Sequence, residues 1–347
     1  MKRPSFYFWK WLTALFDIYA YLLNARHLRK FGIIERRPTP DIKKIVGSQE
    51  GSVESFYGSF GSNQDVGLRV AGYKQRADGL VESYLTFSSP FVSSSLENNT
   101  VRAVLYKNGE DVDKVIILVN GVFVSFNSAD RYMARMLAGN GFDCCVMALP
   151  YHGPRRHPYL KSGLAFIAPD HFATAEAFIQ SVLDCNKLHE ILSSSFGYKE
   201  IYIVGFSVGG NAALVSSFMK EYGAVALIMA GIPPADTVWS IPMPYAVAVR
   251  EKVNQHYSLD EVRNLWKMSD PRNFGSQPKN QKFLVLAGLF DWFKPKFTLN
   301  IREFLPGSEM IVYPASHASA LLFMGPAVKN IQRFFRGQPV IQTPRRL

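Results

Sequence analysis

From about residue 80 onward, short apolar runs alternate with longer stretches in which apolar residues recur every three or four positions. Runs of the first kind are typical of strands buried on both faces, and stretches of the second kind are typical of helices that cover a sheet. The central runs are residues 115–119, 144–149, 201–204, 225–229, 283–287 and 311–313. The helical stretches between them are residues 129–138, 171–192, 209–222 and 318–335. This order predicts an α/β domain with a mostly parallel sheet flanked by helices.

Two further β-rich runs, residues 80–87 and 100–106, come before the central ones and are joined by a polar, turn-rich connection. We expect them to form an antiparallel edge, which gives an eight-stranded sheet in one domain over residues 80–336. Residues 45–79, which are rich in Gly and Ser, indicate a connecting segment, and residues 337–347 form a basic tail.

The stretch 231–282, between two of the central runs, holds six prolines. A connection of this length in a compact domain is usually functional, so we expect a lid inserted into the domain. Four large side chains would then line an apolar pocket, or would simply pack against the core. They are Trp239, Met243, Tyr245 and Trp266.

Near the amino end, apolar and aromatic residues recur at helical spacing and predict one apolar stripe on a helix. They are Phe8, Trp11, Leu12, Leu15, Phe16, Tyr19, Leu22 and Leu23. Lys10 and Asp17 interrupt the segment, so it makes a poor membrane-spanning helix, and no small-residue cleavage site indicates a secretory signal. The stripe is typical of a helix lying in a membrane interface and equally of a helix packed on the domain core.

The positive charge is concentrated in this same region. Residues 1–44 hold ten Lys and Arg against three Asp and Glu, which is +7 of the formal net charge of +11. This basic amphipathic arm favours an anionic membrane surface as partner, whereas no motif indicates nucleic-acid binding. The three cysteines offer neither metal-ligand spacing nor an even disulfide framework, so we expect reduced core residues in a cytoplasmic protein. If the arm binds a membrane and does not pack on the core, the protein would be peripheral there.

Gly205-Phe206-Ser207-Val208-Gly209 follows a buried strand and precedes a helix. A serine on such a strand-turn-helix has a strained backbone and is exposed at the sheet edge as a nucleophile. Glycines two residues before and two after are needed because the crossing backbones leave no room for side chains. The motif therefore predicts Ser207 as a nucleophile.

With this motif the chain resembles the α/β-hydrolase superfamily over about residues 80–336. The resemblance implies an acid after a later strand and a histidine after the last one, and Asp291 and His317 stand at those positions. A carboxylate there would orient the imidazole, and histidine is the side chain that exchanges protons near neutral pH. Asp236 is a rival acid, and Asp291 would otherwise be a helix cap.

Asn120-Gly121-Val122 follows the strand at which this family often carries His-Gly, so the resemblance implies an oxyanion hole made by the backbone amides of Val122 and Val208. A tight strand-exit turn is the alternative. In the loop after the next strand, we consider His152, Arg155 and Arg156 as substrate-binding residues, against a solvated basic turn. This loop is similar over a few residues to a little-studied, lipid-acting branch of the family.

These residues predict a serine hydrolase that cleaves a carboxylic ester, of a small molecule or an acyl-lipid, through an acyl-enzyme on Ser207. No metal or organic cofactor is implied. Two alternatives stay open: an acyltransferase that uses the same acyl-enzyme, and a non-catalytic, membrane-associated protein that keeps the hydrolase scaffold.

Overall fold

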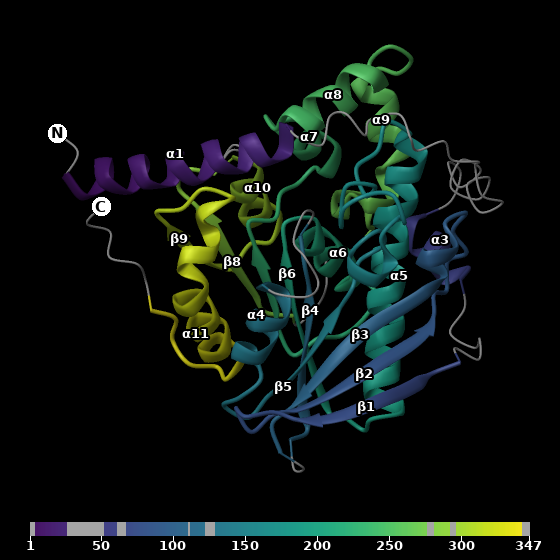
Figure 1. Cartoon of the computed structure of the whole chain (residues 1–347), viewed down its shortest axis with the longest axis vertical. Helices are drawn as coiled ribbons and strands as arrows, with labels where there is room; N and C mark the ends of the chain where they lie inside the picture. Colours follow the sequence, from purple (N-terminus) through teal and green to yellow (C-terminus); the bar gives the residue numbers. More distant parts are fainter. Residues whose placement is uncertain are drawn as a thin grey trace.

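The computed structural model describes residues 4–25, 52–60, 67–109, 112–121, 129–275, 281–291 and 296–341. Within these ranges, one mixed sheet runs through the molecule in the order β1-β2-β3-β5-β4-β6-β7-β8-β9 (Figure 1). Its strands are β1 (Arg69–Gln75), β2 (Val81–Ser88), β3 (Thr100–Lys107), β4 (Lys114–Val119), β5 (Asp143–Met147), β6 (Glu200–Phe206), β7 (Val225–Ile228), β8 (Phe283–Gly288) and β9 (Glu309–Tyr313). The first four strands in this spatial order pair antiparallel and the others pair parallel.

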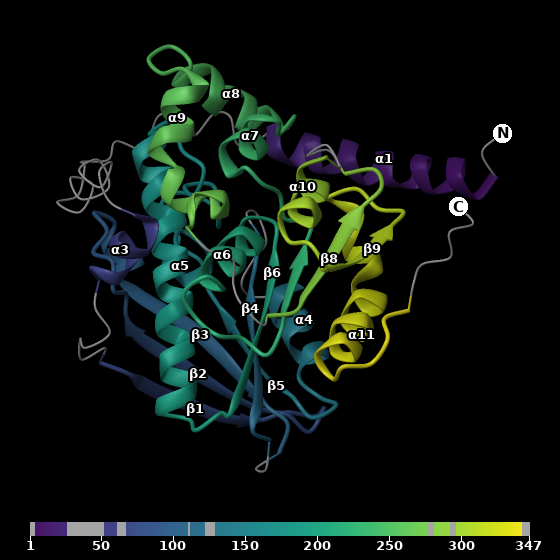
Figure 2. The ribbon, with the colours of Figure 1, turned by 180° about the vertical axis from the view of Figure 1, so that it is seen from behind.

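After the charged first residues of β4, β5 and β6, the central strands are mainly apolar because helices cover both faces of the sheet. Neighbouring residues of β4 belong to different core clusters: Ile117 lies in one, whereas Ile116 and Leu118 lie in the other. Helices α5 (His171–Ser194) and α6 (Val208–Ser216) cover the first face, and α4 (Ala129–Leu137) and α11 (Met324–Phe335) cover the second (Figures 1 and 2). The predicted mostly parallel, helix-covered sheet is thereby confirmed.

The sheet has nine strands within the described residues, and the prediction of eight is wrong. The additional strand is β1, which lies inside the stretch 45–79 that the sequence indicated as a connecting segment. All of its residues are exposed at the sheet edge, so it carries no apolar alternation. The same stretch contains α3 (Val53–Gly58), whose Tyr57 hydroxyl donates a hydrogen bond to the carbonyl of Met268 at 3.0 Å. The described parts of this stretch, residues 52–60 and 67–79, are therefore part of the folded domain.

The predicted lid consists of three helices, α7 (Pro234–Trp239), α8 (Pro244–Val253) and α9 (Leu259–Leu265), above the sheet (Figure 2). Two short 3₁₀ turns, η5 (Lys267–Ser269) and η6 (Pro271–Asn273), follow these helices. The remaining short elements are η3 (Leu96–Asn99), η4 (Gly153–Arg155), η7 (Ser319–Phe323) and the helix α10 (Lys296–Phe304), which the sequence analysis did not predict.

Helix α1 (Pro4–Ala25) lies across the end of the sheet where β8 and β9 finish (Figures 1 and 2). The side that packs on the domain carries Phe6, Trp9, Thr13, Asp17 and Ala20. Much of the predicted apolar stripe faces away from the domain instead. Its residues Phe8, Trp11, Leu15, Tyr19 and Leu22 are between 45% and 70% exposed. The helix thus packs on the core, but not through the stripe.

Among the helices that the structure describes, none is both long enough and apolar enough to cross a membrane. Of the basic arm 1–44, residues 1–3 and 26–44 lie outside the described residues.

Candidate active site

Ser207 stands in the sharp turn between β6 and α6. Its backbone has φ 54° and ψ −118°, a strained conformation for a residue with a side chain, and its N–H donates to the carbonyl of Ile228 at 2.8 Å. A methyl group added to Gly205 would lie 2.5 Å from Gly210 Cα, and one added to Gly209 would lie 2.7 Å from the carbonyl carbon of Val119. Both glycines are required by close backbone contacts, as the motif predicts.

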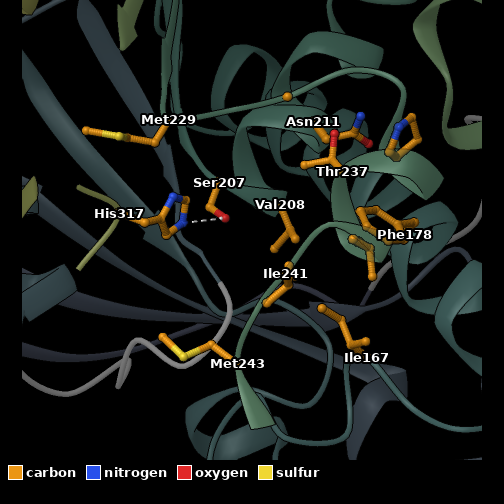
Figure 3. A pocket seen from close by; sticks show the side chains of 13 residues that line it. Ile167, Phe178, Ser207, Val208, Asn211, Met229, Thr237, Ile241, Met243 and His317 are labelled. Carbon is orange, nitrogen blue, oxygen red and sulfur yellow. Dashed lines mark hydrogen bonds between the residues drawn. The ribbon is translucent and has the colours of Figure 1, made fainter. Parts of the chain in front are cut away.

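The structure brings Ser207 together with His317 and Asp291, which lie 110 and 84 residues further along the chain. His317 Nε2 is 3.0 Å from Ser207 Oγ, and Figure 3 shows the imidazole edge directed at the hydroxyl. His317 Nδ1 is 3.3 Å from Asp291 Oδ1 and 3.4 Å from Oδ2. These distances place the imidazole between the Ser207 hydroxyl and the Asp291 carboxylate, which is buried.

The loops that carry the acid and the histidine are fixed to each other and to α1. The Phe290 N–H donates to the carbonyl of Ala315 at 3.0 Å. From α1, the Phe6 ring meets the Phe290 ring edge-on at 5.3 Å, and Asp17 accepts a hydrogen bond from the Ser316 hydroxyl. Helix α1 therefore contacts the residue before Asp291 and the residue before His317.

Of the two amides expected to form an oxyanion hole, the structure describes one. Val208 is the first residue of α6, so its N–H has no acceptor within the helix and lies next to Ser207. Val122 lies outside the described residues. Gly121 passes so close to Ser207 that a methyl group there would lie 3.1 Å from Ser207 Cβ. Gly121, which follows β4, thus borders Ser207.

A cavity of about 70 Å³ opens beside Ser207 and His317. On one side it is bordered by residues of α5 and α6 and of loops that follow strands, and on the other by Gly231 and residues of the predicted lid (Figure 3). Its lining is mostly apolar: Ile167, Phe178, Val208, Met229, Pro234, Val238, Ile241 and Met243, with Asn211 and Thr237 as polar members.

Of the four lid side chains expected at a pocket, only Met243 lines this cavity. The rings of Trp239 and Trp266 pack edge-on with their centroids 6.1 Å apart. The Tyr245 hydroxyl donates to the carbonyl of Leu164 at 2.6 Å. These three are packing residues. Sequence reasoning missed Asn211, which lies in α6 four residues after Ser207 and lines the same cavity.

The rival acid Asp236 lies in α7 and pairs with Arg263, with Arg263 Nε 2.9 Å from Asp236 Oδ2. Its hydrogen bonds to this guanidinium lower the pKa of Asp236 below the ordinary range. The prediction favoured Asp291, and the structure places Asp291, not Asp236, against His317.

The structure corrects the role considered for His152 and Arg155. Neither lines the cavity, and both are buried. Arg155 lies 2.8 Å from Asp184 and donates hydrogen bonds to the carbonyls of Ala148 and Asn98. Because His152 is buried, its pKa is lowered to about 4, and its Nδ1 lies 2.8 Å from the Pro150 carbonyl. Both side chains are committed to the core.

Arg156 is exposed, lies away from the cavity lining, and donates to the carbonyl of Gly153 at 3.2 Å. This is the solvated basic turn that the sequence analysis gave as the alternative. Among the residues that the structure describes, no three His, Cys, Asp or Glu side chains gather in a way that would hold a metal ion.

No protein-family model matches the sequence, and no curated protein sequence is similar to it. The structure is similar to that of an acetyl xylan esterase from a Paenibacillus species, with a TM-score of 0.63 and 15% identity over 90% of this chain and 99% of the other. An acetyl xylan esterase from a Thermoanaerobacterium species gives a TM-score of 0.56 at 17% identity, covering 87% and 98%. A 2,6-dihydroxy-pseudo-oxynicotine hydrolase gives 0.51 at 17% identity, covering 71% and 68%. These likenesses confirm the predicted α/β-hydrolase fold.

Proposed function

We propose that this chain, which has the α/β-hydrolase fold, is a serine hydrolase of carboxylic esters with Ser207, His317 and Asp291 as its catalytic triad. The observation that carries the proposal is the 3.0 Å approach of His317 Nε2 to Ser207 Oγ, with Asp291 on the other imidazole nitrogen. This order of acid, base and nucleophile is what acyl transfer to a serine requires.

In the proposed reaction, His317 Nε2 accepts the hydroxyl proton while Ser207 Oγ attacks the ester carbonyl carbon. The amides of Val208 and Val122 donate to the resulting oxyanion. Collapse of the tetrahedral intermediate breaks the bond to the alcohol oxygen, which takes the proton from His317 and leaves. His317 then takes a proton from a water molecule, whose oxygen attacks the acyl carbon. The bond between the acyl carbon and Ser207 Oγ breaks, Oγ regains the proton from His317, and the acid is released.

The cavity supports a short, uncharged acyl group. Its volume of about 70 Å³ is bordered by apolar side chains, and no Lys, Arg, Asp or Glu of the described residues lines it. One water needs about 10–15 Å³ on this scale, so the cavity has room for roughly five to seven water-sized groups. A chain of about two to six carbons fits on this scale, whereas a long acyl-lipid chain requires α7 and the segment that follows it, with Ile241 and Met243, to move.

We propose in addition that α1 binds an anionic membrane surface. The exposed stripe from Phe8 to Leu22 presents Trp and Tyr beside aliphatic side chains, a composition suited to the headgroup region of a bilayer. The excess of +7 in residues 1–44 adds attraction to anionic lipids. Since α1 contacts both loops of the proposed triad, docking would place the active site at the lipid surface.

The test of the hydrolase proposal is a set of 4-nitrophenyl esters with acyl chains of two to twelve carbons, offered to the wild type and to Ser207→Ala. We expect the wild type to hydrolyse the short esters and to lose activity along the series, and Ser207→Ala to lose at least about 10³-fold in kcat while unfolding at the same temperature. A folded Ser207→Ala variant that keeps wild-type activity would remove the assignment. Transfer to added alcohols with no hydrolysis would instead favour an acyltransferase.

A further inference from the structure

One polar side chain in the cavity is left without a partner. Asn211 lies in α6, lines the cavity together with Ser207, and is only 3% exposed. Within the described part of the chain, neither its Oδ1 nor its Nδ2 has a hydrogen-bond partner. A buried amide that is unpaired on both atoms is uncommon in folded proteins and destabilises them unless a ligand completes its hydrogen bonds.

The surroundings of Asn211 give the amide nothing else to bind. Most of the lining is aliphatic or aromatic, including Phe178, Val238 and Ile241. The neighbouring Thr237 already donates its hydroxyl hydrogen to the carbonyl of Pro233 at 2.7 Å. Both atoms of the Asn211 amide therefore remain open to a molecule that enters the cavity.

The position of Asn211 relative to Ser207 says which part of a substrate it meets. Ser207 is the residue directly before α6, and the Asn211 N–H donates to the Ser207 carbonyl at 3.2 Å, so Asn211 lies one backbone turn beyond Ser207. The acyl group stays bonded to Ser207 Oγ in the acyl-enzyme while the alcohol must leave. Figure 3 shows both residues at the same cavity. One helical turn is about 5.4 Å long, so an acyl chain that extends from Ser207 Oγ along this cavity would meet the amide at its third or fourth carbon.

We propose that the cavity selects short acyl groups that carry a neutral hydroxyl group on their third or fourth carbon, and that Asn211 recognises this hydroxyl. The proposal rests on the proposed hydrolase function and names its substrate class. A hydroxyl group both donates and accepts, so it can bind Oδ1 or Nδ2, whereas an oxo group only accepts. A carboxylate substituent is disfavoured because, in the part of the chain that the structure describes, no cationic side chain lines the cavity.

The experiment compares 4-nitrophenyl 3-hydroxybutyrate with 4-nitrophenyl butyrate, which differ by one hydroxyl group. We expect the wild type to favour the hydroxylated ester at least tenfold in kcat/KM, because a site built to bind a hydroxyl discriminates strongly against the analogue that lacks it. In Asn211→Leu, which has similar volume and no polar atoms, this ratio should fall about 10- to 100-fold. The control Val238→Ala changes the apolar lining alone and should leave the ratio within about threefold of the wild type.

Three results would overturn the proposal. A wild type that hydrolyses both esters equally, or prefers butyrate, contradicts it even if Asn211→Leu does not fold. A folded Asn211→Leu that keeps the wild-type ratio shows that the amide does not read the hydroxyl. If the folded wild type hydrolyses neither ester and Ser207 resists a serine-directed probe, the hydrolase function itself fails, and the selectivity with it.

Discussion

The buried ion pair between Arg155 and Asp184 allows a test of whether the loop after β5 stabilises the fold or binds substrate. Both side chains are 0% exposed, and Arg155 Nη1 lies 2.8 Å from Asp184 Oδ2. Arg155 also donates to the carbonyls of Ala148 and Asn98 at 2.8 Å and 2.6 Å, and Ser89 donates to the carboxylate at 2.6 Å. Burial raises the pKa of Asp184, and the charge of Arg155 opposes that rise. Each charge depends on its partner.

Replacing Arg155 by Met removes the guanidinium and leaves Asp184 buried without a counter-charge. Breaking a buried pair on one side typically costs about 3–5 kcal/mol of unfolding free energy, and we expect Arg155→Met to fall in this range. Replacing both partners, in Arg155→Met with Asp184→Leu, removes the unpaired charge as well. The double variant should therefore recover most of the loss and lie within about 2 kcal/mol of the wild type.

The assay is urea unfolding followed by circular dichroism, with exposed Arg156→Met as the matched control, expected to change the unfolding free energy by no more than about 0.5 kcal/mol. Ester hydrolysis by the folded Arg155→Met variant should keep the wild-type KM. If Arg155→Met is as stable as Arg156→Met and instead raises KM, the side chain contacts substrate and our account of this loop is refuted.

Three further outcomes are expected. Burial lowers the pKa of His152 to about 4, so the contribution of this side chain to stability is present above pH 6.5 and is lost as the pH falls towards 4. Between pH 7 and pH 4.5, the unfolding free energy measured in urea should therefore fall by up to about 3 kcal/mol less in His152→Gln than in the wild type; equal falls in both proteins contradict this. Asp17→Ala removes the acceptor of the Ser316 hydroxyl beside the proposed base, so kcat should fall about 3- to 10-fold at unchanged KM, and an unchanged kcat rules out positioning by α1. Trp11→Glu should weaken sedimentation with phosphatidylserine vesicles at least tenfold, whereas Tyr159→Glu, an exposed aromatic outside α1, should not; equal binding by both variants argues against the membrane proposal.

The strands that the sequence predicted are those whose residues are buried on both faces of the sheet. The central strands β4 to β8 are apolar because both faces are covered, and β6 with α6 carries glycines that close backbone contacts demand. The exposed edge strand β1 has no such pattern, so its pairing with β2 is set by the neighbouring strand and not by a local signal.

In the candidate site, too, the sequence predicted the residues that have a local signal and missed those whose role depends on distant contacts. Asp291 and His317 were predictable because each follows a strand whose end lies at the same sheet edge as Ser207. The roles of Arg155 and Asn211 depend on distant contacts: Asp184 lies on α5, and the wall opposite Asn211 comes from residues after β7. No pattern local to either residue indicates that Arg155 is buried or that Asn211 faces a cavity.

The central claim, that Ser207 is a nucleophile activated by His317, is tested most directly by covalent labelling. Purified protein is treated with a fluorophosphonate probe, and the modified residue is identified by mass spectrometry. We predict modification of Ser207 in the wild type and its loss in a folded His317→Ala variant. A folded wild type that stays unmodified at Ser207, or a His317→Ala variant that is labelled as fast as the wild type, would contradict the claim.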